Sequence, residues 1–432
     1  MLFTFRAFCL AIVSFILGIA QAQTAAKCSP TLTPKFPLPS VAPGYVVRLV
    51  ANGLTGPRKI HFDSAGHLLV LEKGVGVTSL TFKDSGKGCL NLSSRKIVVA
   101  NIDLNHGLEL SADSKTLYAS DVDKVYKWTY APATQKVTSS NTTIVSGMYN
   151  LDHPTRSLLL SKRVPGMMVV NRGSAANLDF DAESLATGRS QVRAFNIANT
   201  AALPYNFSTT GTLLGWGLRN EVGLAEHPTT GGLYGVENSV DNLKRNGVDV
   251  HQTNPAEELN FFGYLNGTVH SNQGSNFGYP DCFTAWDTSV ISNWTGTVGQ
   301  QFSNDSTIDT ACASRTNPRL AFHPHNAPLD ILFNNAGTTG WITFHGSWNQ
   351  AQASGYALGK VTFQDGQPVD PSTSTTAVTY IAQSKSVTTC SSSKCWRPVG
   401  LAWDSKGRLF MSSDATGEIY AIEKTDGSGI NN

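Results

Sequence analysis

Short apolar segments separated by turn residues recur along the chain, and one phrase of this kind is repeated. Its clearest copies are residues 59–70 and 400–411, in which two β-rich segments flank the same Asp-Ser-x-Gly turn. Such segments around a short glycine-containing turn are typical of a β-hairpin. The sequence therefore predicts a hairpin at each of these places.

Four weaker copies lie between these two, at residues 108–119, 158–170, 223–236 and 320–344. The six copies begin roughly 50 to 95 residues apart, at or above the blade length of propeller repeats. A small sheet of this kind buries its faces by packing radially against its neighbours. The chain is therefore predicted to be all-β, a six-bladed β-propeller with long loop inserts over one mouth of the channel.

A β-sandwich is the alternative, but six similar hairpins over this length fit a propeller better. Glycine and proline interrupt nearly every window, so long amphipathic helices are not expected. We expect residues 45–50 to pair with residues 418–422, because closing the ring removes exposed sheet edges. The insert at 249–283 is expected to form part of the mouth over the channel.

The first 22 residues are predicted to be a signal peptide. A positively charged start at Arg6 is followed by an apolar stretch at 7–20, and small residues precede a predicted cleavage site before Gln23. A membrane anchor is the alternative, but the stretch is shorter than the roughly 20 residues that a spanning helix needs. Residues 23–432 are thus expected to be one secreted, extracellular propeller domain with no membrane segment in the mature form.

Sequons and cysteines agree with a secretory route. Sequons for N-glycosylation occur at Asn91, Asn141, Asn206, Asn266, Asn293 and Asn304. Of the seven cysteines, Cys9 lies in the signal peptide, so six remain and disulfides are expected. Neighbourhood in the sequence favours Cys390 with Cys395 and Cys282 with Cys312, which leaves Cys28 with Cys89, although the sequence alone does not exclude other pairings. No cysteine or histidine spacing indicates a structural zinc site.

The charge balance and the missing motifs narrow the function. The chain has 33 basic and 31 acidic residues, so it carries no electrostatic footprint for nucleic acid, and a small neutral substrate is the more natural partner. It has no Gly-x-Ser-x-Gly elbow and no dinucleotide-binding glycine motif between a strand and a helix. Redox chemistry, if present, must use a cofactor other than a nicotinamide or a flavin.

Polar residues stand directly before four of the predicted hairpins, at Arg58, Asp152-His153, Arg219-Asn220 and Arg397. The same position in each blade of a propeller points to the same rim of the channel, so these side chains are expected to converge. Guanidinium groups bind carboxylates bidentately, and a histidine can act as a general base. The pattern therefore favours an anionic, planar cofactor; the alternative is that each arginine caps loop carbonyls.

Several longer motifs carry a family resemblance. They are Gly-Leu-Arg-Asn-Glu-Val-Gly-Leu at 217–224, Glu-Asn-Ser-Val-Asp-Asn at 237–242, Asn-Pro-Ala-Glu-Glu-Leu-Asn at 254–260, Asn-Phe-Gly-Tyr-Pro at 276–280 and His-Gly-Ser-Trp-Asn at 345–349. Together they resemble the glucose/sorbosone dehydrogenase family, and most of all its fungal pyrroloquinoline-quinone-dependent pyranose dehydrogenases. The resemblance runs from about residue 43 to residue 422.

The resemblance implies an activity and a set of roles. A secreted oxidoreductase of this kind uses pyrroloquinoline quinone and calcium to oxidise a pyranose or related keto-sugar, and passes electrons to an external acceptor such as a cytochrome or a copper oxygenase. His153 matches the general base, and Arg219 matches the residue that contacts the quinone and stabilises developing negative charge. The remaining matches to cofactor contacts are Arg58, Asn220, His345 and Arg397. The calcium loop corresponds to Ser239 and Val240, with Asp241 beside them.

The chain departs from the bacterial soluble glucose dehydrogenases at two places. They have Gly-Pro at the calcium loop, where this chain has Ser239-Val240. They also support the base with a carboxylate from the next strand, where this chain has Asn171. Asp152 is expected to alternate away from His153 on an extended strand.

Two other functions compete with sugar oxidation. Six-bladed propellers also include calcium-dependent lactonases, which need side-chain carboxylates and asparagines around the metal, whereas the predicted rim carries arginines. A non-catalytic propeller that binds sugar or protein is the second alternative, because fold does not fix function.

Overall fold

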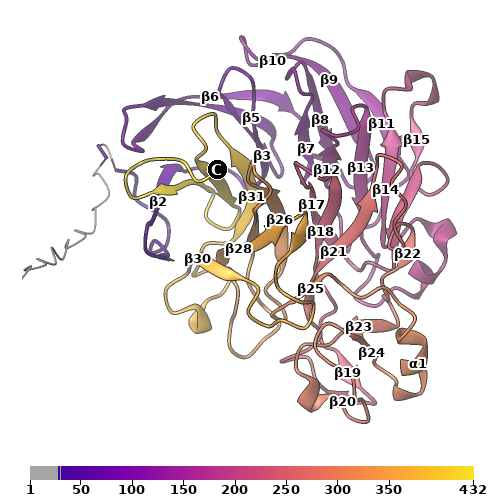
Figure 1. Ribbon diagram of the computed structural model, residues 1–432. Coiled ribbons are helices and arrows are strands. Elements are labelled where there is room, and N and C mark those ends of the chain that lie inside the picture. Colours follow the sequence, from indigo (N-terminus) through magenta and orange to yellow (C-terminus); the bar gives the residue numbers. More distant parts are fainter. Residues whose placement is uncertain (1–27, 30) are drawn as a thin grey trace, which may run out of the picture.

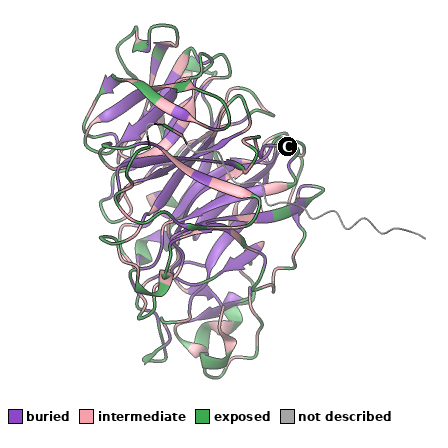
Figure 2. Cartoon of the chain, turned by 90° about the vertical axis from the view of Figure 1, so that its left-hand side faces the viewer, coloured by how far each residue is buried: buried purple, intermediate pink, exposed green. Residues whose placement is uncertain are grey.

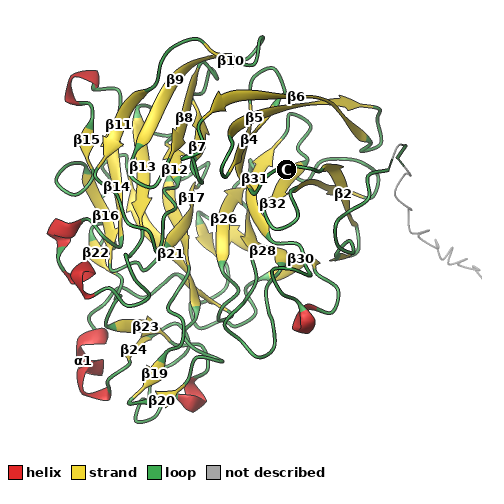
Figure 3. Cartoon of the chain, turned by 180° about the vertical axis from the view of Figure 1, so that it is seen from behind, coloured by secondary structure: helices red, strands yellow, loops and turns green. Residues whose placement is uncertain are grey.

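Six sheets arranged around one axis form the molecule. The computed structural model describes residues 28, 29 and 31–432, so the predicted signal peptide lies outside the described residues. The sheets radiate from the centre like the blades of a propeller (Figures 1 and 3). The all-β, six-bladed prediction is confirmed, and the sandwich alternative is wrong.

Each blade has four main antiparallel strands, ordered from the channel outward. Blade 1 is β3 (Pro57–Phe62), β4 (Leu68–Glu72), β5 (Gly76–Asp84) and β6 (Leu90–Ala100). Blade 2 is β7 (Leu108–Leu110), β8 (Thr116–Ser120), β9 (Val125–Ala131) and β11 (Thr142–Ser146). Blade 3 is β12 (Leu158–Leu160), β13 (Met167–Arg172), β14 (Gln191–Asn196) and β16 (Thr212–Trp216).

The second half of the ring repeats this arrangement. Blade 4 is β17 (Glu221–Glu226), β18 (Gly232–Glu237), β21 (Glu257–Tyr264) and β25 (Leu320–Phe322). Blade 5 is β26 (Pro328–Phe333), β27 (Thr339–Phe344), β28 (Ala357–Gln364) and β30 (Thr379–Gln383). Blade 6 is β31 (Pro398–Trp403), β32 (Leu409–Ser413), β33 (Glu418–Lys424) and, from the other end of the chain, β2 (Tyr45–Ala51).

Shorter elements decorate the blades. The added strands are β1 (Ser40–Val41), β10 (Lys136–Val137), β15 (Tyr205–Asn206), β22 (Ser275–Asn276) and β29 (Gln367–Pro368). The 3-10 helices are Phe180–Glu183, Leu185–Thr187, Thr200–Ala202, Thr288–Val290, Ser306–Ile308 and Val387–Thr389. No helix in the described ranges is long and apolar enough to cross a membrane.

The ring closes as the sequence predicts. Strand β2 pairs with β33, with Val47 opposite Ile422 and Leu49 opposite Tyr420. The innermost strands of the six blades contact one another all the way round, including β3 with β31 where the ends of the chain meet. Pairing the two ends of the chain within one blade leaves no open edge at the join.

Five of the six predicted hairpins lie where the repeated phrase placed them, and one boundary is wrong. Residues 320–322 do not open the fifth hairpin, because β25 pairs with β21 and completes blade 4. The fifth hairpin starts at Pro328 with β26. Two short apolar runs separated by a Pro-rich turn look alike in sequence, although one is the last strand of a blade and the next is the first strand of another.

Large apolar side chains fill the spaces between blades. Tyr234, Phe333 and Phe363 pack edge to face between blades 4 and 5, and Phe62 packs in the same way on Phe410 between blades 1 and 6. Figure 2 shows buried strands through the interior and exposed residues mainly in the loops. Each buried aromatic ring contributes about 1.5–3 kcal/mol through removal from water.

All three predicted disulfides are present, and they join Cys28 to Cys89, Cys282 to Cys312 and Cys390 to Cys395. The first disulfide ties the N-terminal segment that precedes β2 to the turn between β5 and β6. The second lies within the long insert of blade 4. Such bonds persist in oxidising compartments.

The long insert is built differently from the prediction. The segment 249–283 is not one loop, because it contains β21, the third strand of blade 4. The insert proper holds β19 (Lys244–Arg245), β20 (Val248–Asp249), β23 (Cys282–Thr284), β24 (Gln301–Ser303) and α1 (Asp309–Cys312). These elements project together beyond one end of the ring (Figure 1). There His251 and Gln252 hydrogen-bond to His325 and Gln350 in the loops of blade 5.

Candidate functional site

The predicted rim residues lie at one end of the channel. Arg58 is the second residue of β3, and Arg219 and Arg397 lie just before β17 and β31, so all three stand where an innermost strand begins. His345 directly follows β27, the strand that returns to the same end of blade 5. The strand order thus brings these residues to the same end of the channel, as the hairpin positions predict. Their hydrogen bonds divide the site residues into two groups.

The first group is organised by one carboxylate that the sequence analysis missed. Asp414 accepts hydrogen bonds from Arg58 Nη1 at 2.7 Å and from His345 Nε2 at 2.8 Å. Arg397 joins them by donating to the carbonyl oxygens of His345 and Gly346, at 3.1 and 2.8 Å. Burial lowers the pKa of His345 to about 4. Burial opposes ionisation of Asp414, but His345 and Arg58 lower the pKa of that carboxyl far below its usual range.

His106 is a second residue that the sequence analysis missed. It is buried, its Nδ1 accepts from Arg58 Nε at 3.2 Å, and burial lowers its pKa well below the usual value. It stands just before β7, the same position that singled out Arg58 and Arg219 in their blades. Asp414 follows β32 as His345 follows β27. Both could have been found by reading that position in every blade.

The second group centres on His153. Its Nδ1 lies 3.0 Å from the carbonyl oxygen of Ser174 and 2.9 Å from the Ser174 hydroxyl. The hydroxyl donates its hydrogen to Ala176 O at 2.8 Å, so Nδ1 must carry the proton and donate it. Burial, followed by the charges of Arg219 and Arg156, lowers the pKa of His153 to about 3. The ring is therefore neutral at neutral pH, with an unprotonated Nε2.

One expectation about the surroundings of His153 needs correction, and the departure at Asn171 has a structural outcome. Asp152 does not alternate away, because the chain bends here instead of forming a strand, and its half-exposed carboxylate lies 3.6 Å from His153 Nδ1. Asn171 does not support the base. Its amide is buried and joins Ser157 N to Glu221 O, and the support for His153 comes from Ser174.

Arg219 is buried and all of its guanidinium donors are engaged. Nε donates to Asn177 O at 3.2 Å, and Nη2 donates to Asn177 Oδ1 and Asp241 Oδ2 at 2.8 and 3.0 Å. Nη1 donates to the carbonyl oxygens of Ser239 and Asn238, at 2.6 and 3.3 Å. The alternative role for arginine, capping loop carbonyls, thus describes Arg219 in this structure.

The predicted calcium loop offers converging oxygen atoms. The carbonyl oxygens of Asn238 and Ser239 meet at one nitrogen of Arg219, and Asp241 reaches the same guanidinium. The side chain of Val240 is buried below the loop, so only its carbonyl could serve as a ligand. Oxygen donors of this type suit a hard cation. In the described part of the chain, no three acidic, histidine or cysteine side chains already surround a metal position.

Gly173 lies in close contact with both His153 and Asn220. The Oδ1 atom of Asn220 is buried without a hydrogen-bond partner. A Cβ atom at Gly173 would lie 2.8 Å from His153 Cβ and 3.0 Å from Asn220 Oδ1. A side chain at residue 173 would collide with both, so the glycine allows His153 and Asn220 to lie this close to the backbone.

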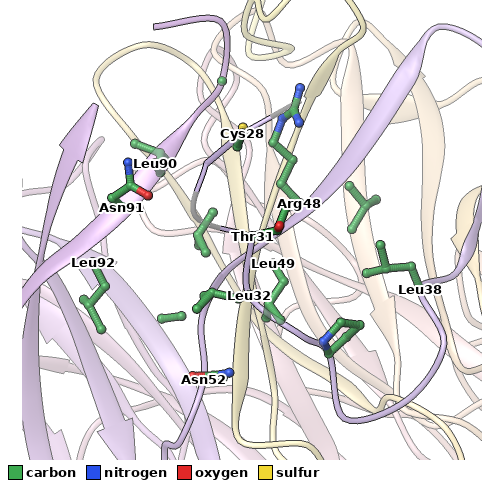
Figure 4. A pocket seen from close by; sticks show the side chains of 15 residues that line it. Cys28, Thr31, Leu32, Leu38, Arg48, Leu49, Asn52, Leu90, Asn91 and Leu92 are labelled. Carbon is green, nitrogen blue, oxygen red and sulfur yellow. The ribbon is translucent and has the colours of Figure 1, made fainter. Parts of the chain in front are cut away.

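A separate pocket lies at the outer edge of the ring. It has a volume of about 380 Å³ and lies between the N-terminal segment and strands β2 and β6, where Leu32, Leu49 and Leu92 contribute apolar walls (Figure 4). None of the predicted site residues lines it. This apolar pocket is therefore separate from the polar groups that converge on the channel.

Known proteins resemble the chain over nearly its whole length. A family model described as TrAA12-like matches residues 39–425. The pyrroloquinoline quinone-dependent sugar dehydrogenase of Hypocrea jecorina (strain QM6a) is 47% identical over 431 residues, which cover 97% of either chain.

Two solved structures superpose closely on this one. The calcium structure of Trichoderma reesei Carbohydrate-Active Enzymes Family AA12 has a TM-score of 0.89 and 48% identity, and the match covers 92% of this chain and 100% of that one. The holo form of the pyranose dehydrogenase PQQ domain from Coprinopsis cinerea has a TM-score of 0.84 and 33% identity, with 92% and 99% covered.

Proposed function

The chain belongs to the TrAA12-like family, and from this membership together with the rim we infer that it is a quinoprotein sugar dehydrogenase. The observation that carries the inference is the polar rim, in which the positively charged side chains outnumber the carboxylates beside them. Arg58 pairs with the single carboxylate of Asp414, which also accepts from His345, and Arg397 donates only to backbone carbonyl oxygens beside them. Such a surplus of guanidinium groups suits a planar, anionic cofactor.

The residues present fit pyrroloquinoline quinone and calcium. Arg58, His345 and Arg397 would hold the anionic groups of the quinone, and Asn220 Oδ1, buried without a partner, would accept a hydrogen bond from it. The carbonyls of Asn238 and Ser239, which converge on one point, would hold calcium with help from Asp241. When bound, the quinone supplies a hydride acceptor, and the metal makes that acceptor more electrophilic.

We propose that His153 is the general base. Its Nδ1–H is fixed by Ser174, so the lone pair of Nε2 is available to take the proton from a sugar hydroxyl. The positive charges of Arg219 and Arg156 disfavour the protonated ring. An anionic molecule bound between His153 and the arginines would offset that effect and raise its pKa toward the working range.

Arg219 is proposed to stabilise the negative charge that develops in the reaction. A cation held by the Asn238 and Ser239 carbonyls would take both acceptors of Nη1, because a carbonyl oxygen directed at a metal no longer points at the guanidinium. Nη1 would then be free to donate to a reacting oxygen. A fixed guanidinium does this without reorganisation.

The substrate is proposed to be a pyranose or a related keto-sugar. The electrons are proposed to pass to an external acceptor such as a cytochrome or a copper oxygenase. The chain is further proposed to be secreted. The three disulfides and the sequons support an oxidising, extracellular location.

The test adds calcium and pyrroloquinoline quinone to protein stripped of both, and supplies a panel of sugars and lactones with a redox dye. Dye reduction by sugars only when both components are present supports the proposal. Lactone hydrolysis with calcium alone would support a lactonase, and binding of sugar without dye reduction would support a non-catalytic propeller.

A further inference from the structure

The loop that follows β13 holds both residues of the proposed reaction. We call residues 174–179 the support loop. Ser174 fixes Nδ1 of His153, and its backbone N–H donates to the carbonyl oxygen of Arg219 at 2.8 Å. Asn177 accepts from Arg219 through its carbonyl oxygen at 3.2 Å and through Oδ1 at 2.8 Å. A shift of this loop would therefore move the base and the arginine relative to each other.

A buried tyrosine stands behind the support loop. Tyr279, from the segment between β22 and β23, is only 4% exposed, and its Oη atom accepts from the backbone N–H of Asp179 at 2.7 Å. The same Oη atom lies 3.1 Å from the carbonyl oxygens of both Ala176 and Asn177, to which its single hydrogen is directed. Burial raises the pKa of Tyr279 to about 12, so the hydroxyl keeps its proton and donates. One side chain thus contacts three of the six residues of the loop.

The two carbonyl oxygens that face Tyr279 also accept from the groups that fix the base and the guanidinium. Ala176 O accepts from the Ser174 hydroxyl at 2.8 Å, which leaves the hydroxyl oxygen free to accept from the histidine ring. Asn177 O accepts from Arg219 Nε at 3.2 Å. A carbonyl oxygen has two lone pairs, so each can serve the tyrosine and one of these groups together.

The backbone of Tyr279 is bound to the segment that leads to Arg219. The N–H of Tyr279 donates to Gly217 O at 3.0 Å. A Cβ atom at Gly217 would lie 3.1 Å from Tyr279 O and would collide with Asn276, and Gly217 has a φ of +69°, where glycine is favoured. The close approach of the two segments therefore depends on this glycine. Tyr279 bridges them, with its backbone on the arginine's segment and its hydroxyl on the support loop.

The ends of the support loop have anchors of their own. The carbonyl oxygen of Ser174 accepts from Asn150 Nδ2 at 2.9 Å. The carboxylate of Asp179 accepts from Ala175 N at 2.7 Å and from Arg189 Nη1 at 2.8 Å. Loss of the tyrosine hydroxyl should therefore loosen the middle of the loop while its ends stay bound.

We propose that Tyr279 is a positioning residue, whose hydroxyl sets the support loop so that the base His153 and the charge-stabilising Arg219 keep their mutual placement. The inference rests on the proposed roles of those two residues. Tyr279 acts through Ser174 and Asn177 and does not itself touch the reacting atoms. Placement matters because an error of about 1 Å at a reaction centre can slow a reaction by about 100-fold.

Tyr279→Phe removes the hydroxyl and keeps the ring. We expect kcat for sugar oxidation to fall by about tenfold or more while KM for the sugar changes little, because only placement in the transition state is lost. Tyr234→Phe is the matched control: Tyr234 is fully buried between blades 4 and 5, and its hydroxyl donates to Gly366 O at 2.6 Å. The control should melt a few degrees lower and keep its kcat. A wild-type kcat in Tyr279→Phe would overturn the proposal.

A second readout needs neither quinone nor sugar. We expect the ¹⁵N NMR resonance of His153 Nδ1 in the cofactor-free protein to shift in Tyr279→Phe, because the Nδ1–H bond to Ser174 changes, and to stay in place in Tyr234→Phe. An unchanged resonance, with equal losses of melting temperature in the two variants, would make Tyr279 a packing residue. If the wild type oxidised no sugar, the proposed function would fail, and the resonance would still decide whether Tyr279 fixes the ring.

Ser174→Ala tests the route from the tyrosine to the base and serves if Tyr279→Phe does not fold. It removes the hydroxyl that lies between His153 and Ala176. Because residues of one hydrogen-bond network are coupled, the double variant should keep at least about twice the kcat that the product of the two single losses predicts. Unchanged kcat in Ser174→Ala, or fully multiplicative losses in the double variant, would overturn the proposal.

Discussion

The arginine rim, at the ends of β3 and β31, differs from a row of three buried glutamates in blade 4, Glu221, Glu237 and Glu258, which lie side by side on β17, β18 and β21. At the rim, Arg58 pairs with one aspartate, Asp414, while Arg397 donates to the backbone carbonyl of His345. In the row, the three glutamates gather around one neutral amide. Buried charge is costly unless it is paired. The rim is thus suited to an anion that enters from the channel mouth, whereas burial within the blade raises the pKa of the three glutamates and favours their neutral form.

Removal of bound components should have the largest effect on the rim. Protein stripped of calcium and quinone is expected to lose sugar oxidation completely, and calcium plus quinone should restore it, because the proposed metal site is assembled partly from the cofactor. Dye reduction is the measurement. Calcium without quinone should restore no activity. Full oxidation by exhaustively stripped protein would show that the rim needs no cofactor.

His153→Ala should lower the rate of sugar oxidation by about 100-fold or more while the protein stays folded, the usual loss for a positioned base. Single-turnover kinetics and melting temperature are measured together. His227→Ala is the matched control: His227 is buried between blades 4 and 5 against Phe333, with Nε2 2.8 Å from Gly337 O. That variant should lose stability and keep its rate. A reversed pattern would make His153 a packing residue.

Arg219→Lys should weaken quinone binding and slow sugar oxidation by about tenfold or more, since about 1.5–3 kcal/mol of charge-assisted hydrogen bonding is lost. Lysine keeps the charge but not the planar fork. Titration of stripped protein with quinone gives the affinity. Arg193→Lys, at a buried arginine of blade 3 that bonds Gln191 and Thr210, is the control. Wild-type affinity in the Arg219 variant would reduce Arg219 to a loop cap.

The pH dependence should be the smallest effect. With the pKa of His153 lowered to about 3, the cofactor-free protein keeps Nε2 unprotonated well below the usual histidine range. The unfolded chain binds this proton first, so the stabilisation is complete above about pH 6.5 and is lost as the pH falls toward 3. Where the binding of sugar or of quinone depends on this ring, its rate should therefore not change between about pH 7 and pH 5. A titration of the His153 ring by NMR near pH 6.5 would contradict the prediction.

The repeated phrase was enough to predict the blades and most of the rim, because hairpin position fixes which end of the channel a side chain faces. Asp414 and His106 obey the same rule and were missed, since each motif was interpreted alone. The support of His153 by Ser174 could not be predicted, because it depends on the bend that follows β13.

The row of three glutamates in blade 4 could not be predicted for a different reason. Glu221, Glu237 and Glu258 are spread over 38 positions of the sequence and meet only through the register of three strands. Each belongs to a motif already interpreted as part of the cofactor site. Sequence shows that these glutamates exist, but only the strand pairing shows that they share a face and a single amide.

The most direct test of the proposed mechanism is the reduction of bound quinone by sugar in a single turnover, followed by the absorbance of the quinone in protein loaded with calcium and quinone. We predict that sugar reduces the quinone in the wild type and in His227→Ala, and that reduction in His153→Ala is slower by about 100-fold or more. Equal rates in all three proteins, or no reduction in the wild type, would contradict the mechanism.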